Sequence, residues 1–144
     1  MAATTRSITV RRPVRDAARV VTDPAAVMAA VSTLGRAART DDAADGAQQW
    51  SVFIVLGTMY MGGTVRIDHA SDGVLAWHAV SGFRHSARFE AVPDGDGSTV
   101  SVTFDFLIGG AITGRLTARL VQGYVARSAE AVLEQLRHSI EFPD

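Results

Sequence analysis

The C-terminal part of the chain carries a helical repeat longer than any other element that the sequence predicts. From residue 111 to 141, apolar side chains recur at steps of three and four residues, the spacing of one helix face. They are Leu116, Leu120, Tyr124, Val125, Ala129, Val132, Leu136 and Ile140. A helix of about thirty residues is ~45 Å long. It outruns any strand that this chain can form, so it must lie across a whole sheet.

The middle of the chain, from residue 36 to 107, has the turn signals of an antiparallel meander. The residues that divide it into runs of strand length are Asp45-Gly46, Gly57, Ser71-Asp72-Gly73, Gly82 and Asp94-Gly95-Asp96-Gly97. The predicted strands are 36–41, 48–56, 62–69, 74–81, 86–92 and 99–107.

The N-terminal part predicts one more strand and a short helix. Residues 7–21 alternate enough for a strand, in which Pro13 marks a bulge or an edge because proline cannot donate to the ladder. In the following segment Asp23 suits a helix N-cap, Pro24 suits the first helical position, and Gly35 ends the helix.

This order of elements predicts an α+β fold in a single domain over residues 1–144. A curved antiparallel sheet of about seven strands wraps around the long C-terminal helix, and the short helix follows the first strand. One helix cannot fill a sheet curved that tightly, so we expect an internal cavity.

The composition excludes several classes of function. With 144 residues, 47% hydrophobic and 20% charged, the chain suits one globular domain. A formal net charge of -1 argues against a nucleic-acid partner. The chain has no cysteine, which excludes thiolate nucleophiles and cysteine-ligated metals. Its four histidines lack the spacing of metal ligands, so we expect no metal and no cofactor.

Two segments bear on localisation. The N-terminal stretch MAATTRSITVRRPV lacks the continuous apolar core of a signal peptide, so we expect a cytoplasmic protein. The uncharged run 46–65 is long enough for a membrane span, but its glycine, glutamine, serine and β-branched residues favour a hairpin. We therefore expect no stable membrane insertion, and the sequence leaves a homodimer open.

Strand pairing predicts which side chains face the helix, because opposed residues of a hairpin share a face. Around Asp94–Gly97, an even loop pairs Phe89 with Val102. Around residues 71–73, a three-residue loop pairs Ile67 with Trp77 and sorts the faces better than a two-residue turn. Trp77 and Ser81 then face inward, and His78 faces outward near Arg66.

The connections at 57–61, 82–85 and 107–111 are predicted to share one rim, because successive strands alternate in direction. The side chains there are Met59, Tyr60, Met61, Phe83, Arg84, His85 and Ile108. Thioethers, aromatic rings and glycines at a rim suit a pocket mouth. The same side chains are equally consistent with ordinary loops that pack against the end of the core.

The segment VLAWHAVSG, an arginine-containing turn, the strand GSTVSVTF and a Gly-Gly entry to the long helix together resemble a known family. It is the polyketide cyclase/dehydrase branch of the SRPBCC superfamily, which has the START-like, birch-pollen-allergen-like helix-grip fold. Members often carry glycine where this chain has Ala87. The resemblance implies a cavity for an apolar ligand such as a lipid, sterol, isoprenoid or polyketide. Its members include aromatase/cyclases, carriers and proteins without a known reaction.

The side chains that could do chemistry are few. Arg84 could hold an anionic oxygen, Tyr60 or Tyr124 could donate a proton, and His85 lies at the predicted mouth. Tyr124 equally suits packing on the long helix. The predicted ligand-binding residues are Met59, Met61, Trp77, Ser81, Phe83, Phe89, Phe104, Phe106, Leu116, Leu120 and Tyr124.

Three functions are consistent with this pattern. The first is soluble binding of a hydrophobic small molecule, with or without cyclase or dehydratase activity. The alternative is a true polyketide aromatase/cyclase that acts by folding its substrate and by a few polar groups at the cavity mouth. An interaction module on the outer sheet face ranks last, because the predicted register makes that face mostly polar.

Overall fold

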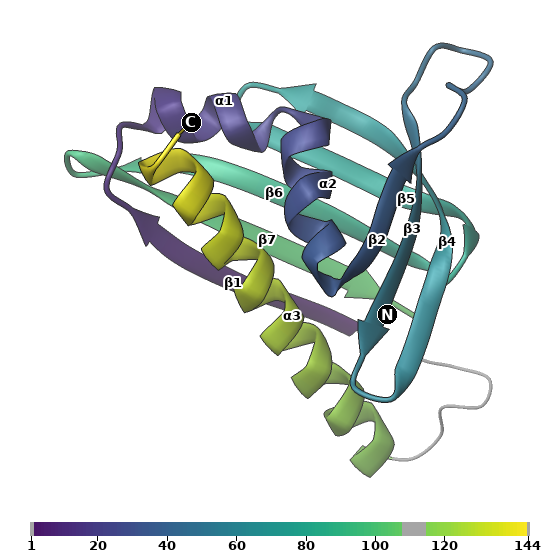
Figure 1. Ribbon diagram of the computed structural model, residues 1–144. Coiled ribbons are helices and arrows are strands. Elements are labelled where there is room, and N and C mark those ends of the chain that lie inside the picture. The colour runs from purple at the N-terminus through teal and green to yellow at the C-terminus, as the bar shows by residue number, and fades with distance from the viewer. Residues whose placement is uncertain (1, 108–114, 144) are drawn as a thin grey trace.

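The structure is a computed structural model that describes residues 2–107 and 115–143. It contains one curled antiparallel sheet with helices on its concave side (Figure 1). The elements are β1 (Ala2–Val10), α1 (Val14–Val21), α2 (Pro24–Val31), the 3₁₀ turn η1 (Ser32–Leu34), β2 (Gly35–Arg39), β3 (Gln49–Leu56), β4 (Met59–Ser71), β5 (Val74–Gly82), β6 (His85–Asp94), β7 (Gly97–Phe106) and α3 (Arg115–Glu141).

The strand order is β1-β7-β6-β5-β4-β3-β2, so the last six strands form a continuous meander and β1 pairs with the final one. The helix α3 packs along β1 and β7 and also reaches β3, and Figure 1 shows it lying obliquely across the sheet. The predicted α+β architecture of seven strands around a long C-terminal helix is confirmed.

The prediction of one strand over residues 7–21 is wrong in its second half. The strand β1 ends at Val10, and Val14–Val21 is the helix α1, with Pro13 at its N-cap. Ala17 and Val21 are both fully buried and lie four residues apart, on one face of the helix. Proline is tolerated at the start of a helix, where its missing N–H has no partner to lose. Two short helices therefore follow β1 rather than one.

The second short helix begins as predicted. The Asp23 side chain accepts a hydrogen bond from the Ala25 N–H at 3.1 Å, and Pro24 is the first helical residue. The regular helix ends at Val31 and continues as the 3₁₀ turn to Leu34, directly before Gly35.

The predicted register is confirmed in both hairpins, although one turn differs. Phe89 pairs with Val102, and Ile67 pairs with Trp77. The turn between β4 and β5 contains two residues rather than three, Asp72 and Gly73, both with positive φ, as a tight hairpin turn requires. A bulge at Asp68 supplies the extra residue and keeps Trp77 on the inner face.

The prediction that Ser81 faces inward is wrong because of a second bulge, in β5. Thr64 pairs with Ser81 but Val65 pairs with Ala79, so Val80 is unpaired and the alternation of faces shifts after it. Ser81 is exposed, and its hydroxyl oxygen accepts a hydrogen bond from the Thr64 N–H at 3.3 Å.

The core has two parts. The larger joins α1, α2 and the sheet to the C-terminal half of α3, where Val132, Leu133, Leu136 and Ile140 are at most 4% exposed. The smaller lies beside the N-terminal half of α3 and consists of Leu56, Met61, Phe106, Val121 and Val125. Among the described helices, none is long and apolar enough to span a membrane.

Candidate functional site

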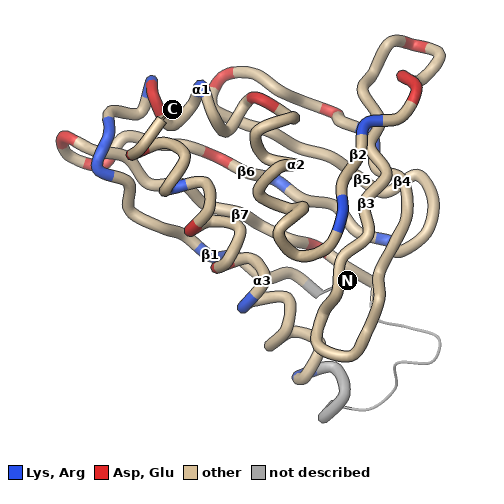
Figure 2. Tube along the Cα trace, in the orientation of Figure 1, with Lys and Arg blue, Asp and Glu red and all other residues tan. Residues whose placement is uncertain are grey.

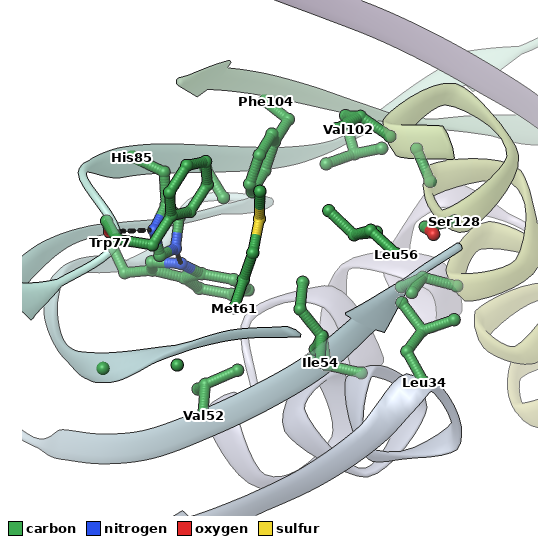
Figure 3. Close-up of a pocket in the computed structure, with 18 of the residues that line it drawn as sticks. Leu34, Val52, Ile54, Leu56, Met61, Trp77, His85, Val102, Phe104 and Ser128 are labelled. Atoms are coloured by element: carbon green, nitrogen blue, oxygen red, sulfur yellow. Dashed lines mark hydrogen bonds between the residues drawn. The ribbon is translucent and has the colours of Figure 1, made fainter. Parts of the chain in front are cut away.

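A pocket lies between the sheet, α2 and the middle of α3, where the two parts of the core meet (Figure 3). Its volume is ≈ 80 Å³. Among the described residues that line it, none carries a permanent charge, and His85 is the one titratable side chain. An apolar molecule that enters the pocket would therefore not displace water from permanently charged side chains of the described lining.

The pocket has an aliphatic wall and an aromatic wall, each built by strand alternation. The aliphatic wall comes from α2, η1 and β3, whose inward residues are Val31, Leu34, Val52, Ile54 and Leu56. The aromatic wall comes from β5, β6, β7 and the turn before β6, and consists of Trp77, Phe83, His85, Phe89 and Phe104. On the aliphatic side, the chain from Gln49 to Val65 has no charged residue, which Figure 2 shows as an unbroken tan hairpin near α3.

The third wall is α3, which contributes Val125, Ser128, Ala129 and Val132. These positions are three and four residues apart, so they share one face of the helix. Ser128 is half-buried and brings a hydroxyl group to this otherwise aliphatic face.

The aromatic wall consists of a stack of three rings and a tilted pair. The imidazole of His85 lies 5.1 Å from the ring of Phe104 and 5.6 Å from that of Phe83, centroid to centroid, and both pairs are stacked. The Trp77 and Phe89 rings are 5.4 Å apart. Such contacts hold the rings in fixed orientations toward the pocket.

A hydrogen bond between Trp77 and His85 provides the main polar feature of the pocket (Figure 3). The indole N–H of Trp77 can only donate, so Nε2 of His85 accepts at 3.2 Å. The proton of the neutral imidazole is then on Nδ1, which donates to the Phe83 carbonyl oxygen at 2.9 Å. Both nitrogens of His85 are engaged, and the tautomer follows from the geometry.

His85 is held in its neutral form by its surroundings. Burial of the imidazole lowers the pKa of His85, and the hydrogen bond to the Phe83 carbonyl offsets only part of this effect. At neutral pH the pocket is therefore uncharged at this position as well. Since the Nε2 lone pair is occupied by Trp77, His85 cannot accept a substrate proton unless that hydrogen bond opens.

Five of the residues predicted to bind a ligand line the pocket: Met61, Trp77, Phe83, Phe89 and Phe104. Of the other predicted residues, those whose side chains the structure describes lie elsewhere. Phe106 is fully buried within the smaller core cluster, against which Met59 also packs. Leu120 is 54% exposed. The side chain of Leu116 lies outside the described residues, as does Ile108 of the predicted rim.

The four candidate catalytic residues do not meet at the pocket, and only His85 lines it. Arg84 is exposed. Tyr60 is 71% exposed and stacks on Phe53 at 5.8 Å, on the opposite side of β4 from Met61. Tyr124 is half-buried, and its ring lies against Gly57 and under the guanidinium of Arg127, 4.9 Å from ring centroid to Cζ.

Predicted and observed orientation agree for His78. It is exposed, pairs with Arg66 across the strands, and hydrogen-bonds through Nδ1 to Asp68 at 2.7 Å. The described residues contain no group of three or more side chains suited to hold a metal ion.

The sequence prediction missed the aliphatic wall and Ser128. A signal for the wall was present, because Val52, Ile54 and Leu56 alternate along a predicted strand. Ser128 lies three residues after Val125 and four before Val132, within the apolar stripe of the long helix. A small polar residue inside such a stripe is the pattern that could have identified it.

Comparison with solved structures supports the fold. A protein of Thermus thermophilus, TTHA0849, superposes with a TM-score of 0.81 at 14% identity over 96% of this chain and 97% of that one. The Zhui aromatase/cyclase from Streptomyces sp. R1128 gives 0.78 at 16% identity, over 97% and 93%. A START superfamily protein from Mycobacterium smegmatis gives 0.66 at 16% identity, over 93% and 98%. These likenesses confirm the helix-grip fold and, at this identity, show the fold alone.

A comparison with curated proteins finds no matching relative. The family model described as "Polyketide cyclase / dehydrase and lipid transport" matches residues 1–141, nearly the whole chain. A match of that extent covers all the strands and helices that the structure describes and all walls of the pocket, so the chain belongs to the polyketide cyclase / dehydrase and lipid transport family.

Proposed function

We propose that this protein binds a hydrophobic small molecule, polyketide-, lipid- or isoprenoid-like, in the pocket between the sheet and α3. The observation that carries the proposal is the lining itself, which is aliphatic on one side, aromatic on the other and free of permanent charge among the described residues. Pockets of this type are the default sites for apolar ligands. The family description, which includes lipid transport, supports the same function.

The size of the pocket constrains the ligand. A volume of ≈ 80 Å³ lies well below the roughly 300–1,000 Å³ typical of pockets for drug-sized ligands. The ligand is therefore small, or the walls move apart as it enters. Three of the lining residues, Leu56, Met61 and Val125, belong to the smaller core cluster.

The geometry favours binding over catalysis. A cyclase needs polar groups directed at the reacting atoms, but Arg84 and Tyr60 are exposed and Tyr124 lies outside the lining. The structural likeness to an aromatase/cyclase keeps that reaction as the alternative. It predicts that Arg84→Ala or Tyr124→Phe abolishes turnover while ligand uptake is retained.

Two measurements test the binding function. Denaturing extraction of the purified protein followed by mass spectrometry should identify a co-purifying apolar compound. Titration with 2-methylnaphthalene, a neutral ring compound, should show saturable binding by calorimetry.

A matched pair of variants places that binding in the pocket. Ala129→Leu fills the pocket and should abolish or strongly weaken it. Ala131→Leu makes the same change on the exposed side of the same helix and should leave it intact. Equal binding by both variants would place the ligand elsewhere, and absence of any binding would refute the function.

A further inference from the structure

The hydrogen bond between Trp77 and His85 places polar atoms on the wall of a pocket whose lining is otherwise mostly apolar. Trp77 presents a donor, the indole N–H, and His85 presents an acceptor, the Nε2 lone pair. Their distance of 3.2 Å is at the long end of the usual range. Trp77 is only 4% exposed and His85 is half-buried, so the pair is partly shielded from water.

A ligand that enters this part of the pocket faces a donor and an acceptor that are already satisfied by each other. A group that engages only one of them leaves the other buried and unpaired, which carries a substantial penalty. A carbonyl or ether oxygen would accept from Trp77 and leave Nε2 of His85 without a donor. A hydroxyl group can accept from Trp77 and donate to His85 at once, so it replaces one hydrogen bond with two.

The charges around the pair restrict the ligand further. The hydrogen bond from Nδ1 to the Phe83 carbonyl keeps the proton on the far side of the ring, and the described lining has no cationic side chain to receive an anion. A carboxylate would be buried without a counter-ion, which is strongly unfavourable. The stacked rings of Phe83, His85 and Phe104 form a broad aromatic face beside the pair, suited to a flat ring.

From these contacts we propose that the Trp77–His85 pair is a specificity-determining site that selects an uncharged ring compound bearing a hydroxyl group, with the hydroxyl placed between the indole N–H and Nε2. This inference rests on the proposed binding function and adds the chemical class of the ligand to it. Figure 3 shows the pair on the aromatic side of the pocket, across from the helix wall that carries Ser128.

The test uses four probes that share one bicyclic ring: 2-naphthol, 2-methoxynaphthalene, 2-methylnaphthalene and 2-naphthoate. Their dissociation constants are measured by calorimetry on the whole protein at neutral pH. For the wild type we expect 2-naphthol to bind about tenfold more tightly than 2-methoxynaphthalene, as one net hydrogen bond implies. We expect no measurable binding of 2-naphthoate.

Variants of His85 separate the hydroxyl contact from general affinity. In His85→Phe the aromatic stack is kept and the acceptor is lost, so the preference for 2-naphthol over 2-methoxynaphthalene should disappear. His85→Gln keeps an acceptor oxygen and should restore part of it. His69→Phe alters an exposed histidine and should leave the preference at its wild-type value.

A measurement on the wild type alone guards against variants that do not fold. The NMR resonance of the Trp77 indole N–H should shift on addition of 2-naphthol and stay near its position with 2-methylnaphthalene, which leaves the pair closed. An unchanged preference in His85→Phe, or binding of 2-naphthoate as tight as that of 2-naphthol, would overturn the inference while the binding function stands. Failure of every probe to bind would overturn both.

Discussion

Replacing Ala129 by leucine tests whether the pocket is empty, because the change should alter the stability of the protein as well as ligand binding. Ala129 is a half-buried residue in the middle of α3 and forms part of the pocket lining. Leucine has nearly the helix propensity of alanine, so the change tests the surrounding space rather than the helix. The sign of the effect depends on whether that space is empty.

The expected size of the effect follows from the volume. A water-sized group needs about 10–15 Å³ in this measure, so ≈ 80 Å³ holds the three added carbons. Burial of three carbons contributes ~2.4 kcal/mol at ~0.8 kcal/mol each. Ordering the leucine side chain opposes this by ~0.5–1 kcal/mol. We expect a gain of ~1.5–2 kcal/mol in the free energy of unfolding, or ~3–8 °C in Tm.

The assay is urea denaturation followed by circular dichroism, with Ala131→Leu as the control. The side chain of Ala131 is exposed on the same helix, so its replacement should change stability by less than ~0.5 kcal/mol. If the interior is already filled, Ala129→Leu instead overpacks it and lowers stability by ~1–3 kcal/mol. That result would refute the pocket as a ligand site, and with it the reasoning from the lining.

Two further predictions follow from the environment of single residues. Folding lowers the pKa of His85 below its ordinary value of 6.5, so the unfolded chain takes up this proton at the higher pH. The free energy of unfolding should therefore fall as the pH drops below about 6.5, and level off below the folded pKa; urea denaturation across this range should show the slope in His69→Phe and lose it in His85→Phe. A Cβ at Gly63 would lie 2.2 Å from the Ser81 carbonyl oxygen, whereas one at Gly62 would lie 3.2 Å from a movable ring. Gly63→Ala should lower stability by at least ~2 kcal/mol and Gly62→Ala by less than ~1 kcal/mol, and similar losses in both would contradict the close approach of β4 and β5.

The sequence predicts well those features of the fold that depend on placing apolar side chains on one face of the sheet and polar side chains on the other. The pairing of Ile67 with Trp77 was predicted from the sorting of apolar and polar residues, and it is correct even though the turn has two residues. The bulge at Asp68 compensates for the shorter turn, because a one-residue slip would have exposed Trp77. Burial of a large aromatic ring outweighs the local preference for a regular ladder.

The sequence prediction of secondary structure is wrong where the strand period and the helix period both fit the same residues. Val14–Val21 alternates loosely as a strand and also places Ala17 and Val21 on one helix face, and Pro13 is compatible with either. Contacts of α1 with β6 and α3 decide between them, and a local pattern contains no information on such contacts. The outward position of Ser81 also depends on a contact between distant residues. The bulge at Val80 lies beside the close approach of Gly63 and Gly82, which a local pattern does not reveal.

The contact of Trp77 with His85 depends on the register of β5 and β6, which the sequence analysis did not predict, and on one strand boundary. Trp77 pairs with Ala87, so the residue two before Ala87 lies diagonally opposite Trp77 on the same face, within reach of a long aromatic side chain. The sequence predicted that this strand begins at residue 86, which left His85 in the turn, whereas β6 begins at His85 itself. Strand ends are the least certain part of such a prediction, because the tertiary contacts that hold a terminal residue in place are not contained in a local pattern. Here those contacts are the aromatic stack with Phe104 and the indole hydrogen bond, and the hydrogen bond is also what gives the pocket its donor and acceptor.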